Sequence, residues 1–165
     1  MPSEKHRLEI GALNQFSDAF ALEFGEGLFT FHGLRSPPEP DGFCSLDGQA
    51  LHVEVGHVYG EESDAKRLLG RTGKSATTPE QQMRSALVPL DGRLLMPLNS
   101  LLASKATKKY QTLRVWLLIR SASPLWSIED FKEHQDGITI PPTHPFEQIW
   151  LLCGSRVSSG MLRLA

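Results

Sequence analysis

The chain of 165 residues has little cysteine, no long apolar run and no large excess of charge of one sign. Its two cysteines, Cys44 and Cys153, lie far apart and belong to no metal or redox motif, so we expect reduced core thiols in a cytoplasmic protein. Apolar runs such as residues 115–119 are too short to span a bilayer, and the first residues, MPSEKHRLEIG, lack the apolar segment of a signal peptide. We therefore expect no membrane partner.

The charge balance is close to neutral. The formal net charge of −2 provides no global positive field, so any polyanion would have to bind a local basic patch. Apolar residues make up 40% of the chain and charged residues 22%, which is typical of a globular protein. The length favours a single domain, residues 1–165, with a sizeable buried core.

Hydrophobic periodicity and turn residues predict an α/β fold with a mixed central sheet and helices on both faces. The dipeptide Asp47-Gly48 lies between β-prone residues and predicts a tight hairpin. The segment SIEDFKEH begins with a serine N-cap and has an acid at capping-box spacing. We expect helices at residues 5–21, 61–69, 98–110 and 127–133, strands at 28–31, 42–46, 50–58, 113–120 and 146–154, and a second small hairpin at 89–97.

Two acidic residues of the predicted hairpin attract attention. Side chains alternate between the faces of a strand, so Val53 and Val55 point to one face while His52 and Glu54 point to the other. The valine face is the natural core face. If the strands pair around the Asp-Gly turn, Asp41 returns to the neighbourhood of Glu54 at one edge of the sheet.

Two adjacent carboxylates do not both ionise readily unless a cation neutralises them. Hard oxygen ligands of this kind suit Mg²⁺ or Mn²⁺, which keep several waters and a substrate phosphate in their remaining positions. The alternative interpretation is that Glu54 is a solvated strand residue and Asp41 a turn former. Pro-Asp, a hairpin and then an apolar-Glu-apolar strand form a more specific pattern than either acid alone.

This pattern, EPDGFCSLDGQALHVEVGH, resembles the signature of the PD-(D/E)XK, or restriction-endonuclease-like, nuclease superfamily. The later segments LLASKATKKYQTLRVWLLI and FEQIWLL are similar to the lysine-bearing helix, the following strand and the final core strand of that superfamily. The resemblance covers about residues 5–155 in the order of its elements.

The resemblance implies an αβββαβ core and metal-dependent hydrolysis of phosphodiester bonds in DNA, with RNA as a further possible substrate. It implies Asp41 and Glu54 as ligands of Mg²⁺ or Mn²⁺, with the backbone carbonyl of Val55 as a further ligand. An assisting acid of the first helix matches Glu9, with Glu23 behind it. A single, nearly neutral domain of this size could also form a homodimer to cut both strands of a duplex.

The chain departs from the superfamily pattern in one place. The lysine expected two residues after the glutamate is replaced by Gly56, which can neither orient the attacking water nor neutralise charge on the phosphoryl group. Lys105 or Lys108, which share one face of the predicted helix, could replace it. Without a replacement, the chain would be a catalytically inactive member that serves as a nucleic-acid or protein binding module.

Other motifs give weaker indications. The segment HVEVGH has the wrong spacing for a zincin helix and lies on a strand, although His52 could contact a metal-bound water or the scissile phosphate. Gly-Lys-Ser at residues 73–75 lacks the earlier glycine of a phosphate loop. The same segment carries a basic cluster, which either is a solvated surface or binds the phosphate backbone of a nucleic acid. It consists of Lys66, Arg67, Arg71 and Lys74.

Overall fold

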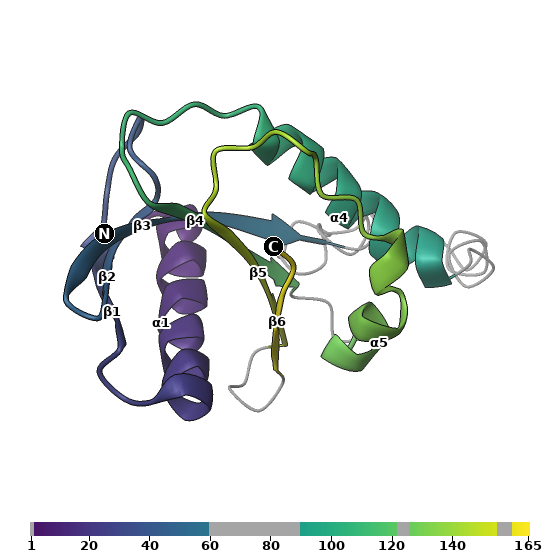
Figure 1. Ribbon diagram of the computed structural model, residues 1–165, viewed down its shortest axis with the longest axis horizontal. Coiled ribbons are helices and arrows are strands. Elements are labelled where there is room, and N and C mark those ends of the chain that lie inside the picture. Colours follow the sequence, from purple (N-terminus) through teal and green to yellow (C-terminus); the bar gives the residue numbers. More distant parts are fainter. Residues whose placement is uncertain (1, 60–89, 122–125, 155–159) are drawn as a thin grey trace, which may run out of the picture.

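The computed structural model describes residues 2–59, 90–121, 126–154 and 160–165 (Figure 1). It has the mixed α/β architecture that the sequence predicts, with a six-stranded sheet in the order β1-β2-β3-β4-β5-β6. The helix expected at 61–69 and the basic cluster of Lys66, Arg67, Arg71 and Lys74 lie outside the described residues. The strands are β1 (Phe29–Leu34), β2 (Gly42–Leu46), β3 (Gln49–Val58), β4 (Val115–Ser121), β5 (Gln148–Cys153) and β6 (Met161–Arg163).

The β2–β3 hairpin forms as predicted. Leu46 pairs with Gln49 across a two-residue turn, in which Asp47 and Gly48 both adopt positive φ angles of 50° and 79°. Such angles favour an Asp-Gly sequence, because glycine carries no Cβ and aspartate tolerates the left-handed region. β2 begins at Gly42, opposite Val53, so the remainder of β3 runs beyond the end of its antiparallel partner.

The centre of the sheet is parallel. β3 pairs with β4 and β4 pairs with β5 in parallel register, whereas β1–β2, β2–β3 and β5–β6 are antiparallel. β4, whose sequence is almost entirely apolar, is buried between two neighbours, as expected of a central parallel strand.

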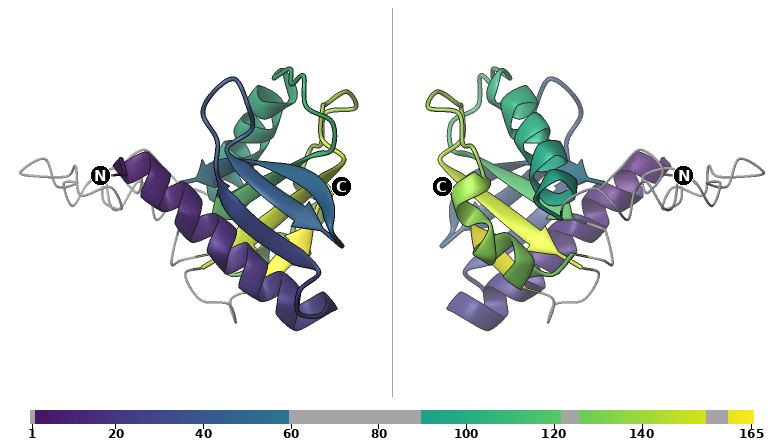
Figure 2. Two further views of the ribbon diagram at one scale, coloured as in Figure 1. Left: turned by 90° about the vertical axis from the view of Figure 1, so that its left-hand side faces the viewer. Right: turned by 90° about the vertical axis from the view of Figure 1, so that its right-hand side faces the viewer.

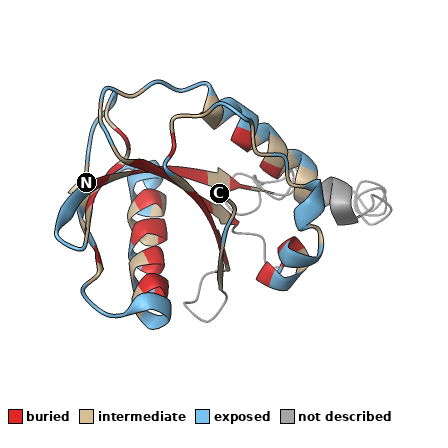
Figure 3. Cartoon of the chain, in the orientation of Figure 1, coloured by how far each residue is buried: buried red, intermediate tan, exposed pale blue. Residues whose placement is uncertain are grey.

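Helix α1 (Glu4–Phe24) crosses one face of the sheet (Figure 2). Its buried residues form a stripe that faces the strands (Figure 3), because apolar side chains recur at helical spacing along it. This stripe packs against the valine face of β3 and against aromatic rings of the sheet. The core on this side includes Leu13, Phe16, Phe20, Phe29, Leu51, Val53, Val55, Trp116 and Trp150.

Helices α4 (Leu90–Ala106) and α5 (Ile128–Glu133) lie on the opposite side of the sheet from α1, with the 3₁₀ turn η1 (Gln135–Gly137) following α5 (Figures 1 and 2). The second core lies beneath them and includes Val58, Leu98, Leu102, Leu117, Ile119, Trp126, Phe131 and Leu151. Ser127 caps α5 in a capping box with Asp130, which confirms the predicted start of this helix.

Three sequence expectations are corrected by the structure. The second hairpin at 89–97 is wrong from Leu90 onward, because α4 begins there and continues through Pro97. Leu95, Leu98 and Leu102 recur at helical spacing and pack into the core, and this burial outweighs the local preferences of Asp-Gly and proline. The helix also ends at Ala106, earlier than the predicted residue 110. The strand at 146–154 is not the last one, because the short β6 pairs with β5.

The expectation for the two cysteines is also confirmed. Cys44 and Cys153 are free and buried. The three tryptophans are core residues as well.

Within the described ranges, no helix has the length and apolar character needed to cross a membrane.

Candidate active site

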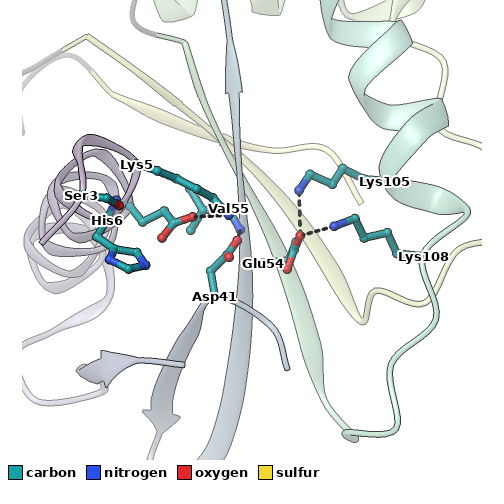
Figure 4. Close-up of polar contacts among 9 residues, drawn as sticks. Ser3, Lys5, His6, Asp41, Glu54, Val55, Lys105 and Lys108 are labelled. Atoms are coloured by element: carbon teal, nitrogen blue, oxygen red, sulfur yellow. Dashed lines mark hydrogen bonds and ion pairs between the residues drawn. The ribbon is translucent and has the colours of Figure 1, made fainter. Parts of the chain in front are cut away.

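The two acids singled out in the sequence lie where β2 begins and β3 continues past it (Figure 4). Asp41 immediately precedes β2, and the pairing of Gly42 with Val53 places it beside Glu54. The Asp41 Oδ2 atom accepts a 2.9 Å hydrogen bond from the backbone N–H of Val55. The Asp41 side chain therefore satisfies a donor on the edge of β3 that β2 no longer reaches.

The backbone carbonyl of Val55 lies at the same edge. In a β-strand, the N–H and C=O groups of one residue point to the same side. Because the Val55 N–H is bound by Asp41, the Val55 carbonyl also points toward the Asp41 side of β3. This places the three oxygen-bearing groups named from the sequence along one stretch of β3.

Glu54 faces away from α1, as strand alternation predicts, and only 3% of its surface is exposed. Two ammonium groups neutralise it. Lys105 Nζ lies 2.7 Å from the Glu54 Oε1 atom, and Lys108 Nζ lies 3.2 Å from the same oxygen. Lys105 is in the last turn of α4, whereas Lys108 follows the helix in a turn closed by the hydrogen bond from its N–H to the Lys105 carbonyl.

Gly56 explains how α4 approaches this strand. A Cβ atom at residue 56 would lie 3.0 Å from the Leu101 Cδ2 atom, which is tighter than ordinary van der Waals contact. A lysine side chain at residue 56 would therefore meet Leu101 of α4. The same close packing of helix on strand lets the next turn of α4 present Lys105 to Glu54.

The charges shift the pKa values of the two acids in opposite directions. Burial raises the pKa of Asp41 to about 6, with smaller upward contributions from the charges of Glu54 and Glu9 that the Val55 N–H and Lys105 only partly offset. Burial alone would also raise the pKa of Glu54. The hydrogen bonds and charges of Lys105 and Lys108 outweigh that effect, so the pKa of Glu54 is lowered.

Glu9 lies on the buried side of α1, 4% exposed, and forms a 3.3 Å ion pair with Lys5 one turn earlier. The charge of Glu9 raises the pKa of Lys5, and Asp41 and Glu54 add to this rise, which places Lys5 near all three acids. Glu23 is on the far end of α1, where it lines a cavity with Phe20 and Phe24, and is not part of this site. Of the two acids of α1 named from the sequence, Glu9 is therefore the one that lies near Asp41 and Glu54.

His52 lies on the same face as Glu54 but packs elsewhere. Its ring is 5.4 Å from the ring of Phe43, its partner across the hairpin. Burial lowers the pKa of His52, and the charge of Arg35 lowers it further. The structure therefore places His52 one row of the sheet away from the carboxylates.

Tyr110 is a neighbour that the sequence did not assign to the site. Its buried hydroxyl makes no hydrogen bond of ordinary geometry with a described residue. Burial raises the pKa of Tyr110, and the negative charge of Glu54 and hydrogen bonding to its carboxylate raise it further, so the phenol lies beside that carboxylate. Lys5 was missed as well, although its i,i+4 spacing from Glu9 was a readable signal.

The donor set fits a small hard cation better than a transition metal. Within the described residues, no three His, Cys, Asp or Glu side chains converge as a ligand set. Mg²⁺ does not need such a cage, since it is commonly held by one or two carboxylates while waters and substrate phosphates complete its octahedron. Asp41 and Glu54, with the Val55 carbonyl, offer ligands of that kind.

Comparison of the chain with protein-family models, with curated proteins and with solved structures finds no match.

Proposed function

We propose that this protein is a metal-dependent phosphodiester hydrolase with a restriction-endonuclease-like αβββαβ core, which cleaves DNA, with RNA as a further substrate. The observation that carries the proposal is the 2.7 Å contact between Lys105 and Glu54, beside Asp41. An acid pair at the end of a hairpin, with a lysine beside it, is the constellation that the PD-(D/E)XK resemblance calls for.

The position of Gly56 supports this assignment. The lysine that the resemblance expects at residue 56 is missing, but the packing of Leu101 on Gly56 leaves little room for one. Lys105 comes from the helix that takes this room. The glycine at residue 56 and the approach of Lys105 to Glu54 are thus both consistent with one packing arrangement of α4 on β3.

The residues can be given chemical roles. A bound Mg²⁺ or Mn²⁺ would polarise the phosphoryl oxygens and acidify an attacking water. Asp41, Glu54 and the Val55 carbonyl would hold it. Lys105 would orient the water and neutralise charge on the phosphoryl group, with Lys108 as a second cation. Glu9 would hold Lys5 by its ion pair, and the ammonium group of Lys5 would offset part of the negative charge near Asp41.

The proposal is tested with plasmid DNA, single-stranded DNA and RNA incubated with Mg²⁺ or Mn²⁺, and then with EDTA. We expect cleavage that EDTA abolishes and that falls at least about 100-fold in Glu54→Gln and Asp41→Asn. The exposed acid Asp136, replaced by asparagine, is the matched control for loss of one carboxylate. Cleavage that persists in EDTA, or that is unchanged in Glu54→Gln, would exclude this mechanism.

A second candidate function is a catalytically inactive protein of the same fold that binds nucleic acid or another protein. The observation that favours it is that both acids already have protein partners, Val55 for Asp41 and two lysines for Glu54. This alternative predicts nucleic-acid or protein binding without any cleavage in Mg²⁺ or Mn²⁺. The same incubation, followed by a gel-shift measurement, separates the two functions.

A further inference from the structure

A cationic and aromatic cluster occupies the sheet face next to the two acids. It consists of His32, Arg35, Phe43 and His52, which we call the Phe43 cluster. The Arg35 guanidinium carbon lies 4.7 Å from the centre of the Phe43 ring. The rings of His32 and His52 lie 5.3 Å and 5.4 Å from the same ring, one on either side along the sheet.

The cluster lies on the same face of the sheet as Glu54. Cys44 and Leu51, the neighbours of Phe43 and His52 along their strands, are buried against α1, so Phe43 and His52 point the other way. A β-bulge between Phe31 and Gly33 accommodates His32, whose Nε2 atom contacts the Ser45 hydroxyl at 2.9 Å. Arg35 and His32 are exposed, and Phe43 is half-buried.

Arg35 contacts one residue of the acid pair directly. Its backbone N–H donates a 2.8 Å hydrogen bond to the carbonyl of Asp41. Its side chain is held over Phe43 rather than by a carboxylate, since no ion pair involves Arg35 among the described residues. Glu39, whose charge also reaches His52, accepts a hydrogen bond from the Thr112 hydroxyl. The Arg35 guanidinium thus keeps donors for an anionic ligand.

The distance between the Phe43 cluster and the acid pair of Asp41 and Glu54 suits a polynucleotide. Phe43 and His52 form one cross-strand row, and Glu54 belongs to the next row on that face, about 7 Å away at ordinary strand rise. Successive phosphates of a nucleic-acid strand are separated by a comparable distance. A strand with one phosphate at Asp41 and Glu54 would therefore place a neighbouring phosphate over the Phe43–His52 row, within reach of Arg35.

We infer that the Phe43 cluster, with Arg35 as its main cation, is the binding site for the phosphate next to the scissile one. This inference rests on the proposed function. It assigns the substrate class as a polynucleotide strand with consecutive phosphates rather than a small phosphodiester. Phe43 acts as a positioning residue that holds the guanidinium in place over its ring.

The test compares Arg35→Ala and Arg35→Gln with the wild-type protein and with the matched control Lys132→Ala, which removes an exposed cation of α5. Binding of fluorescein-labelled single-stranded and duplex DNA, and of single-stranded RNA, is followed by fluorescence anisotropy in EDTA at several salt concentrations. We expect about tenfold weaker binding for both Arg35 variants and a salt dependence reduced by about one phosphate contact, with Lys132→Ala close to wild type.

A second readout uses bis(p-nitrophenyl) phosphate, which has one phosphodiester and no neighbouring phosphate. With Mn²⁺, Arg35→Ala should lose about tenfold more activity on an oligonucleotide than on this small substrate. Wild-type affinity and salt dependence in both Arg35 variants would overturn the inference while leaving the proposed function intact. Arg35-dependent binding without hydrolysis of either substrate would support the phosphate site and overturn the proposed function. A wild-type protein that neither binds nor cuts would overturn both.

Discussion

Asp41 completes the edge of β3 for Val55, whose backbone N–H it binds at 2.9 Å from 14 residues away in the chain. The carboxylate thus has a structural role in addition to any part in metal binding. Asp41→Ala should destabilise the protein by about 1–3 kcal/mol, because it leaves a backbone donor without its partner. Asp41→Asn keeps an acceptor oxygen and should cost clearly less. Equal urea midpoints for the two variants would contradict this role.

The raised pKa of Asp41 makes metal-free stability depend on pH. Its value of about 6 in the folded protein lies above the ordinary value of 3.8. The folded state therefore binds more protons than the unfolded state between these values, and this contribution to stability is lost as the pH rises through about 6. In EDTA, the free energy of unfolding of wild type relative to Asp41→Asn should fall from pH 4 to pH 7. A difference that stays constant, or rises, would show that the pKa is not raised.

The two lysines on Glu54 should differ in importance. The Lys105 side chain is 14% exposed, whereas that of Lys108 is 48% exposed and more strongly screened by water. Lys105→Met should cost about 2 kcal/mol in urea unfolding, since it removes a charge-assisted hydrogen bond to a buried carboxylate. Lys108→Met should cost less than about 1 kcal/mol. Cleavage of DNA should fall more in Lys105→Met as well. The reverse order in both measurements would transfer the proposed role of Lys105 to Lys108.

The contact between Gly56 and Leu101 should appear as an energetic coupling. Gly56→Ala places a methyl group 3.0 Å from Leu101 Cδ2, and the overpacking should cost about 1–2 kcal/mol. In the background of Leu101→Ala, the same substitution should cost little, because the opposing atoms are gone. Thermal or urea unfolding of the four proteins of this cycle measures the coupling. Simple additivity would show that the strand and helix are not in close contact at this point.

The hydroxyl of Tyr110 is buried beside Glu54, and hydrogen bonding to that carboxylate contributes to its raised pKa, although the hydroxyl makes no hydrogen bond of ordinary geometry with a described residue. A bond of such poor geometry offsets little of the desolvation cost, so Tyr110→Phe should leave the melting temperature unchanged or raise it. If the hydroxyl serves the substrate instead, the same variant should lower cleavage while the protein stays as stable as wild type. A destabilised Tyr110→Phe protein would show that the hydroxyl has a structural partner.

Several features of this protein are determined locally and can be predicted from the sequence. The Asp47-Gly48 turn sets the register of the hairpin, and that register places Asp41 beside Glu54. Alternation along β3 turns Glu54 away from the α1 core, and the Ser127–Asp130 capping box fixes the start of α5. These features depend on backbone angles, side-chain alternation and short-range hydrogen bonds, which neighbouring residues specify by themselves.

The tertiary structure decided the rest. α4 runs through Pro97 because Leu98 and Leu102 are buried against the sheet and Leu95 packs beside them, and no local sequence pattern predicts that burial. β6 is a strand because β5 offers it an edge. Sequence reasoning proposed Lys105 as a replacement for the lysine missing at Gly56, but its contact with Glu54 joins residues 51 positions apart and depends on how closely α4 packs on β3. Such contacts arise from the packing of whole elements, because the free energy that fixes them is distributed over many side chains rather than stored in one motif.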